Sequence, residues 1–506
     1  MEIQFHQGAI HYLMESDTQT PSSFPRHPTK NQIKTPSKTH HIISVHIKTI
    51  NSSHKQHHHA TITFLSFYNM VAAARCFCWW LVVALVGFDV IYCLGSNENG
   101  GFGVYRGRKV FLRGVSSSSM NLGLGGGVDL PSSVVFPVYG NAHPLGFYYV
   151  LVNIGQPPKP YFLDPDTGSD LTWLQCDAPC VRCTKAPHPL YRPGNDLVPC
   201  KDSLCAALQP TDYICESPEQ CDYEVEYADG GSSYGVLVND IISLNSTSGD
   251  RNSRLAFGCG YDQIPGPSFH PLDGVLGLGK GKASIVSQLN AQGLTKNILG
   301  HCLSSQGGGY IFIGDSLFDP SHVTWTPMSR DHVNHYSPGP AELIFGGKST
   351  GLKNLLVIFD SGSSYTYFAS RPYQALIYLL RKELAGKPLR DAVDDATLPL
   401  CWKAKKPFKS TTDARKYFKP LALSFWDKGK AAAQFELPPE SYLIISLQGN
   451  VCLGILNGTE VGLQNFNVVG DISMQDKMVI YDNEKQMIGW APTSCDRLPN
   501  ERRPSS

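Results

Sequence analysis

Two short segments of the sequence each place an aspartate in the same local setting. The first reads Tyr161-Phe-Leu-Asp-Pro-Asp166-Thr-Gly-Ser, and the second reads Val357-Ile-Phe-Asp360-Ser-Gly-Ser. In both, an apolar strand precedes Asp-Thr/Ser-Gly-Ser and a second apolar strand follows it. Two carboxyls held close together cannot both ionise easily, so they share one proton. The ionised carboxyl can deprotonate a water while the protonated one donates to a carbonyl, which is the chemistry of amide hydrolysis.

Each aspartate segment has a later partner of the form apolar-apolar-Gly. These partners are Val275-Leu-Gly277 and Val468-Val-Gly470. Gly277 follows Asp166 by 111 residues, and Gly470 follows Asp360 by 110 residues. Two matched motifs at nearly equal spacing predict a duplicated lobe, with the aspartate loops facing each other across a pseudo-twofold axis.

The remaining residues of the two loops are expected to support the carboxyls. Glycine after Asp-Thr/Ser permits a tight loop and lets the backbone approach its twin. The hydroxyls that directly follow the aspartates can hydrogen-bond across the axis, and the later serines can bind the outer carboxylate oxygens. These supporting residues are Thr167, Gly168, Ser169, Ser361, Gly362 and Ser363.

Length and composition favour a large β-rich protein. The chain has 506 residues, of which 42% are hydrophobic, so it contains enough apolar material for a large core. The 47 glycines and 35 prolines, among runs of β-branched and aromatic residues, favour a fold rich in strands and turns. Lys+Arg and Asp+Glu both number 43, so a basic nucleic-acid binder is disfavoured and we expect no nucleic-acid partner.

Cysteine usage indicates an oxidising compartment. Of 15 cysteines, twelve run from Cys176 to Cys495, which suits up to six disulfides. The spacing of Cys176, Cys180 and Cys183 could also hold zinc, but disulfides are favoured if the chain is secreted.

The N-terminal third predicts targeting and linker segments. At Met70, one positive charge precedes an apolar run, which is typical of a secretory signal peptide although it lies far from residue 1. We therefore expect Met70 to be the true start, with a signal anchor, or a plastid or mitochondrial transit region, as alternatives. No later stretch is apolar enough to span a bilayer. The predicted order is a disordered extension 1–69, a signal segment 70–95, a linker or pro-segment 96–140, a first lobe 141–325, a second lobe 326–497 and a polar tail 498–506.

Taken together, the motifs resemble those of pepsin-like aspartic proteases, and more narrowly the cysteine-rich, nucellin-like plant group. The resemblance covers roughly Gly146 to Cys495 and includes Asp273-Gly-Val-Leu-Gly-Leu-Gly and Met487-Ile-Gly-Trp-Ala-Pro. It implies a mainly all-β, bilobal fold with a few short helices and a cleft between the lobes. It also implies a monomeric endopeptidase that acts on polypeptides through Asp166 and Asp360, with no cofactor or metal.

The family resemblance also implies a hairpin flap over the cleft. Residues 221–238 follow the pattern strand, glycine turn, strand. By resemblance Tyr227 is the flap tyrosine and hydrogen-bonds toward Trp173, with Tyr234 as the nearby competitor. Residues 231–235 also match the Gly-x-Ser-x-Gly nucleophile pattern, but that motif needs a following helix and the flanks here are strand-like, so a flap turn is favoured.

Three further expectations follow. By resemblance, Cys401 pairs with Cys452 in the second lobe. Asn245-Ser-Thr and Asn457-Gly-Thr are glycosylation sequons, meaningful only if the chain enters the secretory pathway, where it would be extracellular, vacuolar or endomembrane. Pro165 departs from the family, because an aliphatic residue usually precedes the first aspartate; either its missing N–H is unneeded or the loop is altered.

A second functional class stays open at this point. Some relatives of these proteases are catalytically silent and bind or inhibit other proteins. Such relatives typically lose a catalytic aspartate or the flap tyrosine. Asp166, Asp360 and Tyr227 are all present here, which favours the enzyme.

Overall fold

The structure is a computed structural model, and the chain divides into two compact units, 1–123 and 124–506. It describes residues 133–209, 215, 219–268, 270–330, 334–427, 430–463 and 465–498. In the first unit it describes only five short strands: β1 (Ser44–His46), β2 (Thr61–Thr63), β3 (Cys76–Phe77), β4 (Leu94–Ser96) and β5 (Phe102–Val104). Apart from those strands, the structure does not describe the predicted extension or the predicted signal segment, which includes Met70. The tail beyond residue 498 also lies outside the described residues.

The second unit is mainly β-structure, as the sequence predicts. Its largest sheet has 13 strands in the order β10-β11-β12-β9-β13-β8-β7-β6-β15-β14-β29-β30-β16. Its strands are β6 (Val134–Asn141), β7 (Phe147–Ile154), β8 (Lys159–Asp166), β9 (Trp173–Gln175), β10 (Asp222–Glu226), β11 (Ser232–Leu244), β12 (Arg251–Ile264), β13 (Gly274–Gly277), β14 (Ile298–Leu303), β15 (Gly309–Ile313), β16 (Thr324–Pro327), β29 (Lys477–Asp482) and β30 (Met487–Pro492).

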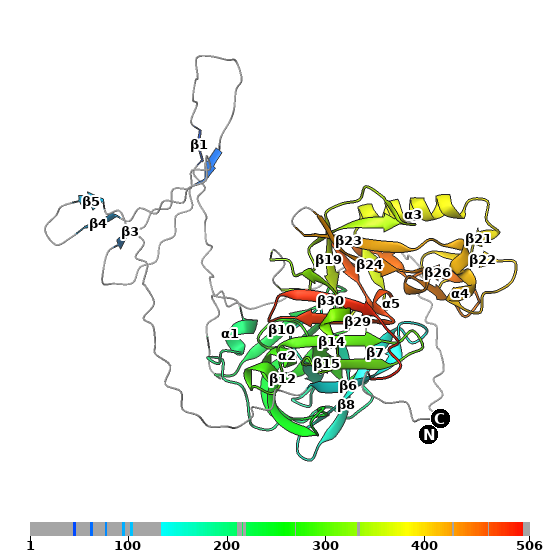
Figure 1. Cartoon of the computed structure of the whole chain (residues 1–506). Helices are drawn as coiled ribbons and strands as arrows, with labels where there is room; N and C mark the ends of the chain where they lie inside the picture. Colours follow the sequence, from blue (N-terminus) through cyan, green and yellow to red (C-terminus); the bar gives the residue numbers. More distant parts are fainter. Residues whose placement is uncertain are drawn as a thin grey trace, which may run out of the picture. The chain divides into compact units, whose positions relative to one another are not determined.

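Two smaller sheets form the second lobe (Figure 1). One has the order β24-β23-β17-β19-β28-β20-β27, with β18 paired to β17, and the other the order β21-β22-β26-β25. These strands are β17 (Pro340–Phe345), β18 (Lys348–Ser349), β19 (Leu355–Phe359), β20 (Thr366–Phe368), β21 (Leu389–Asp391), β22 (Cys401–Ala404), β23 (Leu421–Asp427), β24 (Lys430–Leu437), β25 (Leu443–Ile445), β26 (Val451–Leu453), β27 (Ile455–Asn457) and β28 (Phe466–Val469).

The helices are few and short, which confirms the predicted fold class. α2 (Ile285–Ala291) begins where Ser284 accepts a hydrogen bond from the Ser287 N–H, a typical N-cap. α3 (Ser370–Leu384) buries residues at helical spacing, Leu376, Leu380 and Leu384, so it packs on the core of the second lobe. The other α-helices are α1 (Cys205–Leu208), α4 (Thr411–Ala414) and α5 (Asp471–Met474).

The last strands of the chain pair with the first lobe. β29 pairs with β14, and Figure 1 shows red β29 and β30 beside green β14. Residues 477–492 therefore lie in the 13-stranded sheet, although the sequence assigns them to the second lobe. The folded region also begins earlier than predicted, because β6 starts at Val134, inside the expected linker, and pairs with both β7 and β15.

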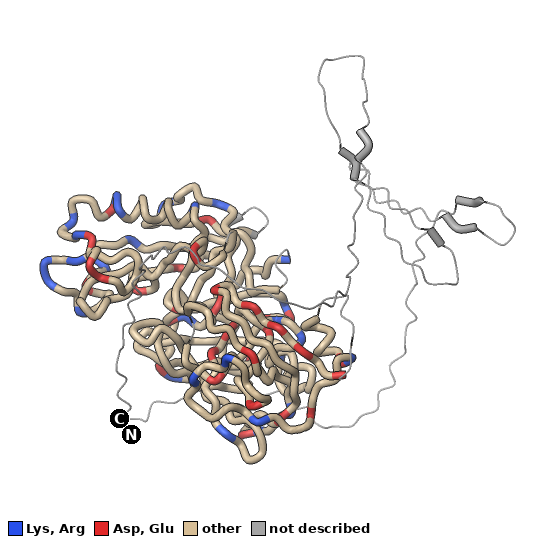
Figure 2. Tube along the Cα trace, turned by 180° about the vertical axis from the view of Figure 1, so that it is seen from behind, with Lys and Arg blue, Asp and Glu red and all other residues tan. Residues whose placement is uncertain are grey.

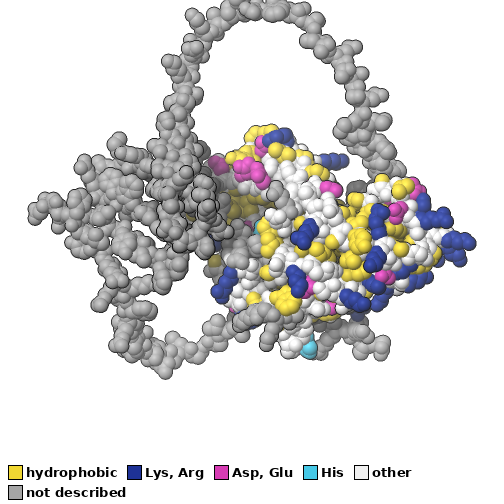
Figure 3. All heavy atoms as spheres, turned by 90° about the horizontal axis from the view of Figure 1, so that it is seen from above, with side chains coloured by type: hydrophobic (Ala, Val, Ile, Leu, Met, Phe, Trp, Pro, Cys, Tyr) yellow, Lys and Arg dark blue, Asp and Glu magenta, His cyan; other side chains and the backbone are white. Residues whose placement is uncertain are grey.

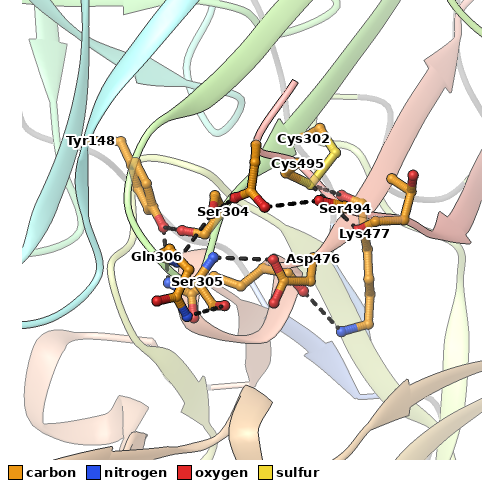
Figure 4. The surroundings of a disulfide bond; sticks show 12 residues. Tyr148, Cys302, Ser304, Ser305, Gln306, Asp476, Lys477, Ser494 and Cys495 are labelled. Carbon is orange, nitrogen blue, oxygen red and sulfur yellow. Dashed lines mark hydrogen bonds between the residues drawn. A yellow bond between two sulfur atoms is a disulfide. The ribbon is translucent and has the colours of Figure 1, made fainter. Parts of the chain in front are cut away.

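A disulfide reinforces this C-terminal pairing. Cys302 on β14 is bonded to Cys495, just beyond β30 (Figure 4). Beside it, the Ser304 hydroxyl donates to the Asp496 carboxylate at 2.6 Å, and Tyr148 OH donates to the Ser304 carbonyl at 3.0 Å. The disulfide and these bonds hold the end of the chain against the first-lobe sheet.

All twelve cysteines from Cys176 onward are paired. The bonds are Cys176–Cys259, Cys180–Cys183, Cys200–Cys215, Cys205–Cys221, Cys302–Cys495 and Cys401–Cys452. The structure thus contains the pairing that the resemblance implies for Cys401, and it pairs the cysteines of the candidate zinc motif as disulfides.

Charge is unevenly distributed over the second unit. Exposed lysines gather at the end of the second lobe that carries β21, β22 and α4, namely Lys405, Lys406, Lys409 and Lys416 (Figures 2 and 3). Among the described residues, no helix is long and apolar enough to cross a membrane.

Candidate active site

Both aspartates lie at the ends of central strands with equivalent neighbours. β8 ends at Asp166 and pairs in parallel with β13, so that Gly277 is the partner of Asp166. β19 ends one residue before Asp360 and pairs in parallel with β28, and the Asp360 N–H donates to the Val469 carbonyl at 3.1 Å. The equal spacing in the sequence is therefore the spacing between paired strands in each lobe.

Each carboxyl is held by its own loop in the same way. The Gly168 N–H donates to Asp166 Oδ1 at 2.7 Å, and the Gly362 N–H donates to Asp360 Oδ1 at 3.0 Å. The outer Oδ2 oxygens accept from Ser169 Oγ in the first loop and from Ser363 Oγ, at 2.9 Å, in the second. The structure thus brings both serines to the oxygens that the sequence assigns to them.

The two carboxyls lie against each other. A Cβ at Gly168 would lie 2.7 Å from Asp360 Oδ1, and one at Gly362 would lie 2.5 Å from Asp166 Oδ1, so only glycine fits at either position. Burial raises the pKa of Asp166, and the neighbouring Asp360 carboxyl raises it further. These are the conditions under which a carboxyl pair holds one shared proton.

A reciprocal set of hydrogen bonds joins the loops. The Thr167 hydroxyl accepts from the Ser361 N–H at 2.9 Å and donates to the Phe359 carbonyl at 3.1 Å. The Ser361 hydroxyl accepts from the Thr167 N–H at 3.2 Å and donates to the Pro165 carbonyl at 2.7 Å. Because each bond has a counterpart across the axis, the carboxyls are fixed relative to each other rather than to one lobe alone.

The surroundings of Pro165 explain why proline is accepted there. The pairing of β7 with β8 ends at Leu163, so no strand on that side needs an N–H from residue 165. On the other side of β8, the residues that flank β13, Asp273 and Leu278, donate their N–H groups to the carbonyls of Phe162 and Asp166. The loop that follows Pro165 makes the same hydrogen bonds as its twin in the second lobe.

A hairpin covers the carboxyls. β10 and β11 pair antiparallel, and at the turn between them Tyr227 OH accepts from Trp173 Nε1 at 2.6 Å. The competitor Tyr234 is 42% exposed and does not line the cleft. Ser233, the serine of the nucleophile-like motif, is buried in β11 beside Tyr223 OH, and no helix follows it. The cavity under the hairpin measures about 380 Å³ and is lined by residues of both lobes, including Asp166, Tyr227 and Asp360.

The sequence analysis missed three neighbours of the pair. Asp164 lines the cavity two residues before Asp166, a strand alternation that could have revealed it. Asp471, at the start of α5, is 2% exposed, and its Oδ1 has no hydrogen-bond partner among the described residues. Behind the loops, the buried Tyr481 hydroxyl lies 3.1 Å from His301 Nε2, a contact that no motif indicates.

The two predicted glycosylation sites differ in setting. Asn245 is exposed directly after β11. The Asn457 side chain accepts from the Thr459 N–H at 3.3 Å and donates to Glu460 at 3.0 Å, so a glycan on that nitrogen would replace the second bond.

The sequence of the chain matches two family models and several individual plant proteins. The models described as xylanase inhibitor N-terminal and C-terminal domains match residues 148–315 and 347–492. An aspartic proteinase of Oryza sativa subsp. japonica is 47% identical over 387 residues, which cover 73% of this chain and 92% of the relative. Aspartic proteinase 39 of Arabidopsis thaliana is 29% identical, covering 72% and 78% respectively.

Solved structures share the fold. The crystal structure of soybean basic 7S globulin superposes with a TM-score of 0.56 at 17% identity, covering 74% of this chain and all of the globulin. Conglutin gamma from lupine seeds gives 0.55 at 18% identity, covering 72% of this chain and 96% of conglutin. On the strength of the rice relative and the two matched domains, the chain belongs to the plant pepsin-like aspartic proteinase family.

Proposed function

We propose that the protein is an active aspartic endopeptidase in which Asp166 and Asp360 activate a water between them. The observation that carries this proposal is the matched support of both carboxyls, each bound by a glycine N–H and a serine hydroxyl. A protein that only binds others does not need two carboxyls in contact, which is a costly arrangement.

The geometry supports a general acid–base mechanism. The shared proton leaves one carboxyl ionised, and this carboxyl accepts a proton from water as the water attacks the peptide carbonyl. The protonated carboxyl donates to the carbonyl oxygen, where negative charge develops. The carboxyl that took the proton from water then donates it to the nitrogen as the C–N bond breaks. A hydroxyl of the tetrahedral intermediate returns its proton to the other carboxyl as the new carboxyl product forms, so the pair regains its starting state. Tyr227 closes the cavity over the reacting bond and excludes bulk water.

The matched family models carry the name of an inhibitor, so a silent protein-binding role is the second candidate. That role would make the aspartates dispensable. The two candidates therefore differ in what Asp166→Asn and Asp360→Asn do.

The test is peptide cleavage by the purified protein and both single variants across about pH 3 to 8. Each variant removes a charge with little change of shape, so we expect each to lose roughly 1,000-fold or more in kcat, and the double variant to lose little more. The wild-type profile should be bell-shaped and acidic. Asp319→Asn, on a surface carboxyl that caps Ser321 and pairs with His322, is the matched control. Cleavage that survives either substitution, or peaks in alkali, would favour the silent role.

We also propose that the chain enters the secretory pathway from Met70. The six disulfides support this proposal, because they persist in oxidising compartments. Chains beginning at Met1 and at Met70 should be expressed in plant cells and their glycans and location compared. Entry of the Met1 chain alone would contradict the proposal.

A further inference from the structure

One carboxyl in the cleft has no role in the mechanism. Asp164 lies on β8 two residues before Asp166, so both side chains point to the same face of the strand. Leu163 and Pro165, the residues on either side of Asp164, are buried on the opposite face. Asp164 is partly exposed and lines the cavity, and no hydrogen bond or ion pair joins its carboxyl to another described residue.

Strand register places Asp164 in the wall of a subsite beside the catalytic pair. Val275 of β13 is the partner of Asp164 in the parallel pairing, and it is also the partner of Trp173 on β9. All three residues line the cavity, and Trp173 holds the flap through Tyr227. A side chain docked here would contact one aromatic ring, one aliphatic side chain and one unpartnered carboxyl.

The charges around the cavity have one sign. Among the described residues that line it, none is lysine or arginine, although lysines gather at the far end of the second lobe. Two histidines, His270 and His335, are the other titratable bases. The carboxyls in the lining are Asp164, Asp166, Glu226, Asp229 and Asp360.

We propose that Asp164 makes this subsite select a basic side chain, lysine or arginine, next to the bond that is cut. The inference rests on the proposed function and names its substrate class. The aliphatic stem of lysine or arginine would pack on Val275 and Trp173, and its charged end would reach the Asp164 carboxyl. An acidic side chain would meet a carboxyl and an apolar wall, so it would be rejected.

The preference of this subsite for a basic side chain should change with pH in a defined direction. Burial raises the pKa of Asp164 well above its usual value, and the charges of Asp166 and Asp360 raise it further. Asp471 and Tyr227 are the other titratable groups that interact with it. A docked cation favours the ionised form of Asp164, so preference for a basic side chain should grow as the pH rises from acid toward neutral.

The experiment compares peptides that differ only in carrying Lys, Leu or Glu at each position flanking the scissile bond. We expect the wild type to cleave a Lys peptide at least about tenfold better in kcat/KM than its Leu counterpart, a difference of about 1.4 kcal/mol. Asp164→Asn should abolish this preference and its pH dependence while still cleaving the Leu peptide. Asp164→Glu should restore part of the preference. Asp262→Asn, on a half-buried carboxyl paired with Arg182, should change neither the preference nor its pH dependence.

A binding measurement separates this inference from the proposed function. Two non-cleavable analogues, with a hydroxyethylene group in place of the scissile amide and either a Lys or a Leu side chain beside it, are titrated into the wild type and Asp164→Asn. Tighter binding of the Lys analogue that is lost in Asp164→Asn supports the subsite even if no peptide is cleaved. Equal or tighter binding of the Leu analogue by the wild type would overturn it, whether or not cleavage occurs.

Discussion

At the scale of single residues, the aspartate pair is the part of the candidate site that the sequence predicts most completely. Asp166 and Asp360 are identified because a duplication repeats both the loop and its glycine partner at matched spacing. The supporting residues follow from the same repeat, and the structure places each one at the contact assigned to it. A short motif is more informative when the chain repeats it, because the role inferred for each residue of one loop can be compared with its counterpart in the other.

Residues outside the repeat could not be found in the same way. Asp164 stands two positions before Asp166, but its twin position, Ile358, is apolar, so the comparison of lobes hides it. His301 and Tyr481 meet across 180 residues of chain, and nothing local to either marks the contact. For Pro165 the departure from the family is visible in the sequence, but the end of the β7–β8 pairing at Leu163, which leaves the missing N–H without a strand partner on that side, is visible only in the structure.

At the scale of elements, local patterns were sufficient where neighbours in sequence pair with each other. The flap hairpin β10–β11, the helix α2 and the helix α3 all follow from turn, cap and periodicity signals. The pairing of β29 with β14 has no such signal, because it joins strands about 180 residues apart. Sequence order alone therefore does not reveal that the last strands of the chain join the 13-stranded sheet.

The flap tip is itself tethered, which no hairpin pattern predicts. Asp229 at the turn accepts from the Gly231 N–H at 2.9 Å and from both the N–H and the hydroxyl of Ser268, beyond β12. On the opposite side, a Cβ at Gly462 would lie 3.2 Å from the Ala228 carbonyl, so the tip also lies close to the second lobe. The hairpin is thus held closed by a carboxylate outside the catalytic pair.

Asp229→Ala should therefore loosen the flap. We expect KM to rise about three- to tenfold with a smaller change in kcat, because hydrogen bonds to a charged group contribute roughly 1.5–3 kcal/mol before solvent exposure weakens them. Amide hydrogen exchange across 222–232 should become faster. Asp319→Ala removes the same kind of contact, from Asp to a serine N–H and hydroxyl, at a surface turn and serves as the matched control. Unchanged exchange in the flap would show that other contacts hold it closed.

At the scale of the whole molecule, two sets of titratable groups have opposite effects on the stability of the fold as the pH changes. Burial raises the pKa values of Asp164, Asp166 and Asp471 above the usual 3.8, and the neighbouring carboxyls add to the effect. Burial lowers the pKa of His301 from 6.5 to about 3 and that of His270 to about 4. In the folded state these carboxyls therefore stay neutral to a higher pH, and these histidines stay neutral to a lower pH, than in the unfolded chain.

Because the two pKa shifts have opposite signs, the carboxyls lower the stability of the fold at higher pH and the histidines lower it at lower pH. A carboxyl whose folded pKa is raised stabilises the fold fully below its unfolded pKa, and this contribution is lost as the pH rises above about 4 through the folded value. A histidine whose folded pKa is lowered contributes fully above its unfolded pKa, and this contribution is lost as the pH falls below about 6.5. Each pKa unit corresponds to about 1.4 kcal/mol, so the fold should be most stable in weak acid.

Substitution at one group from each set should separate the two limits. Asp471→Asn is neutral at every pH, so its stability relative to the wild type should increase as the pH rises from about 4 to 8. His301→Gln should do the opposite, gaining relative to the wild type as the pH falls from about 6.5 to 4. Midpoints of thermal unfolding at matched ionic strength measure both trends, and only the slope of the difference matters, so any constant cost of repacking cancels. If the unfolding midpoints of the wild type and Asp471→Asn change with pH in parallel, Asp471 stays ionised in the folded protein. The greater stability in acid would then have to come from the aspartate pair and Asp164 alone.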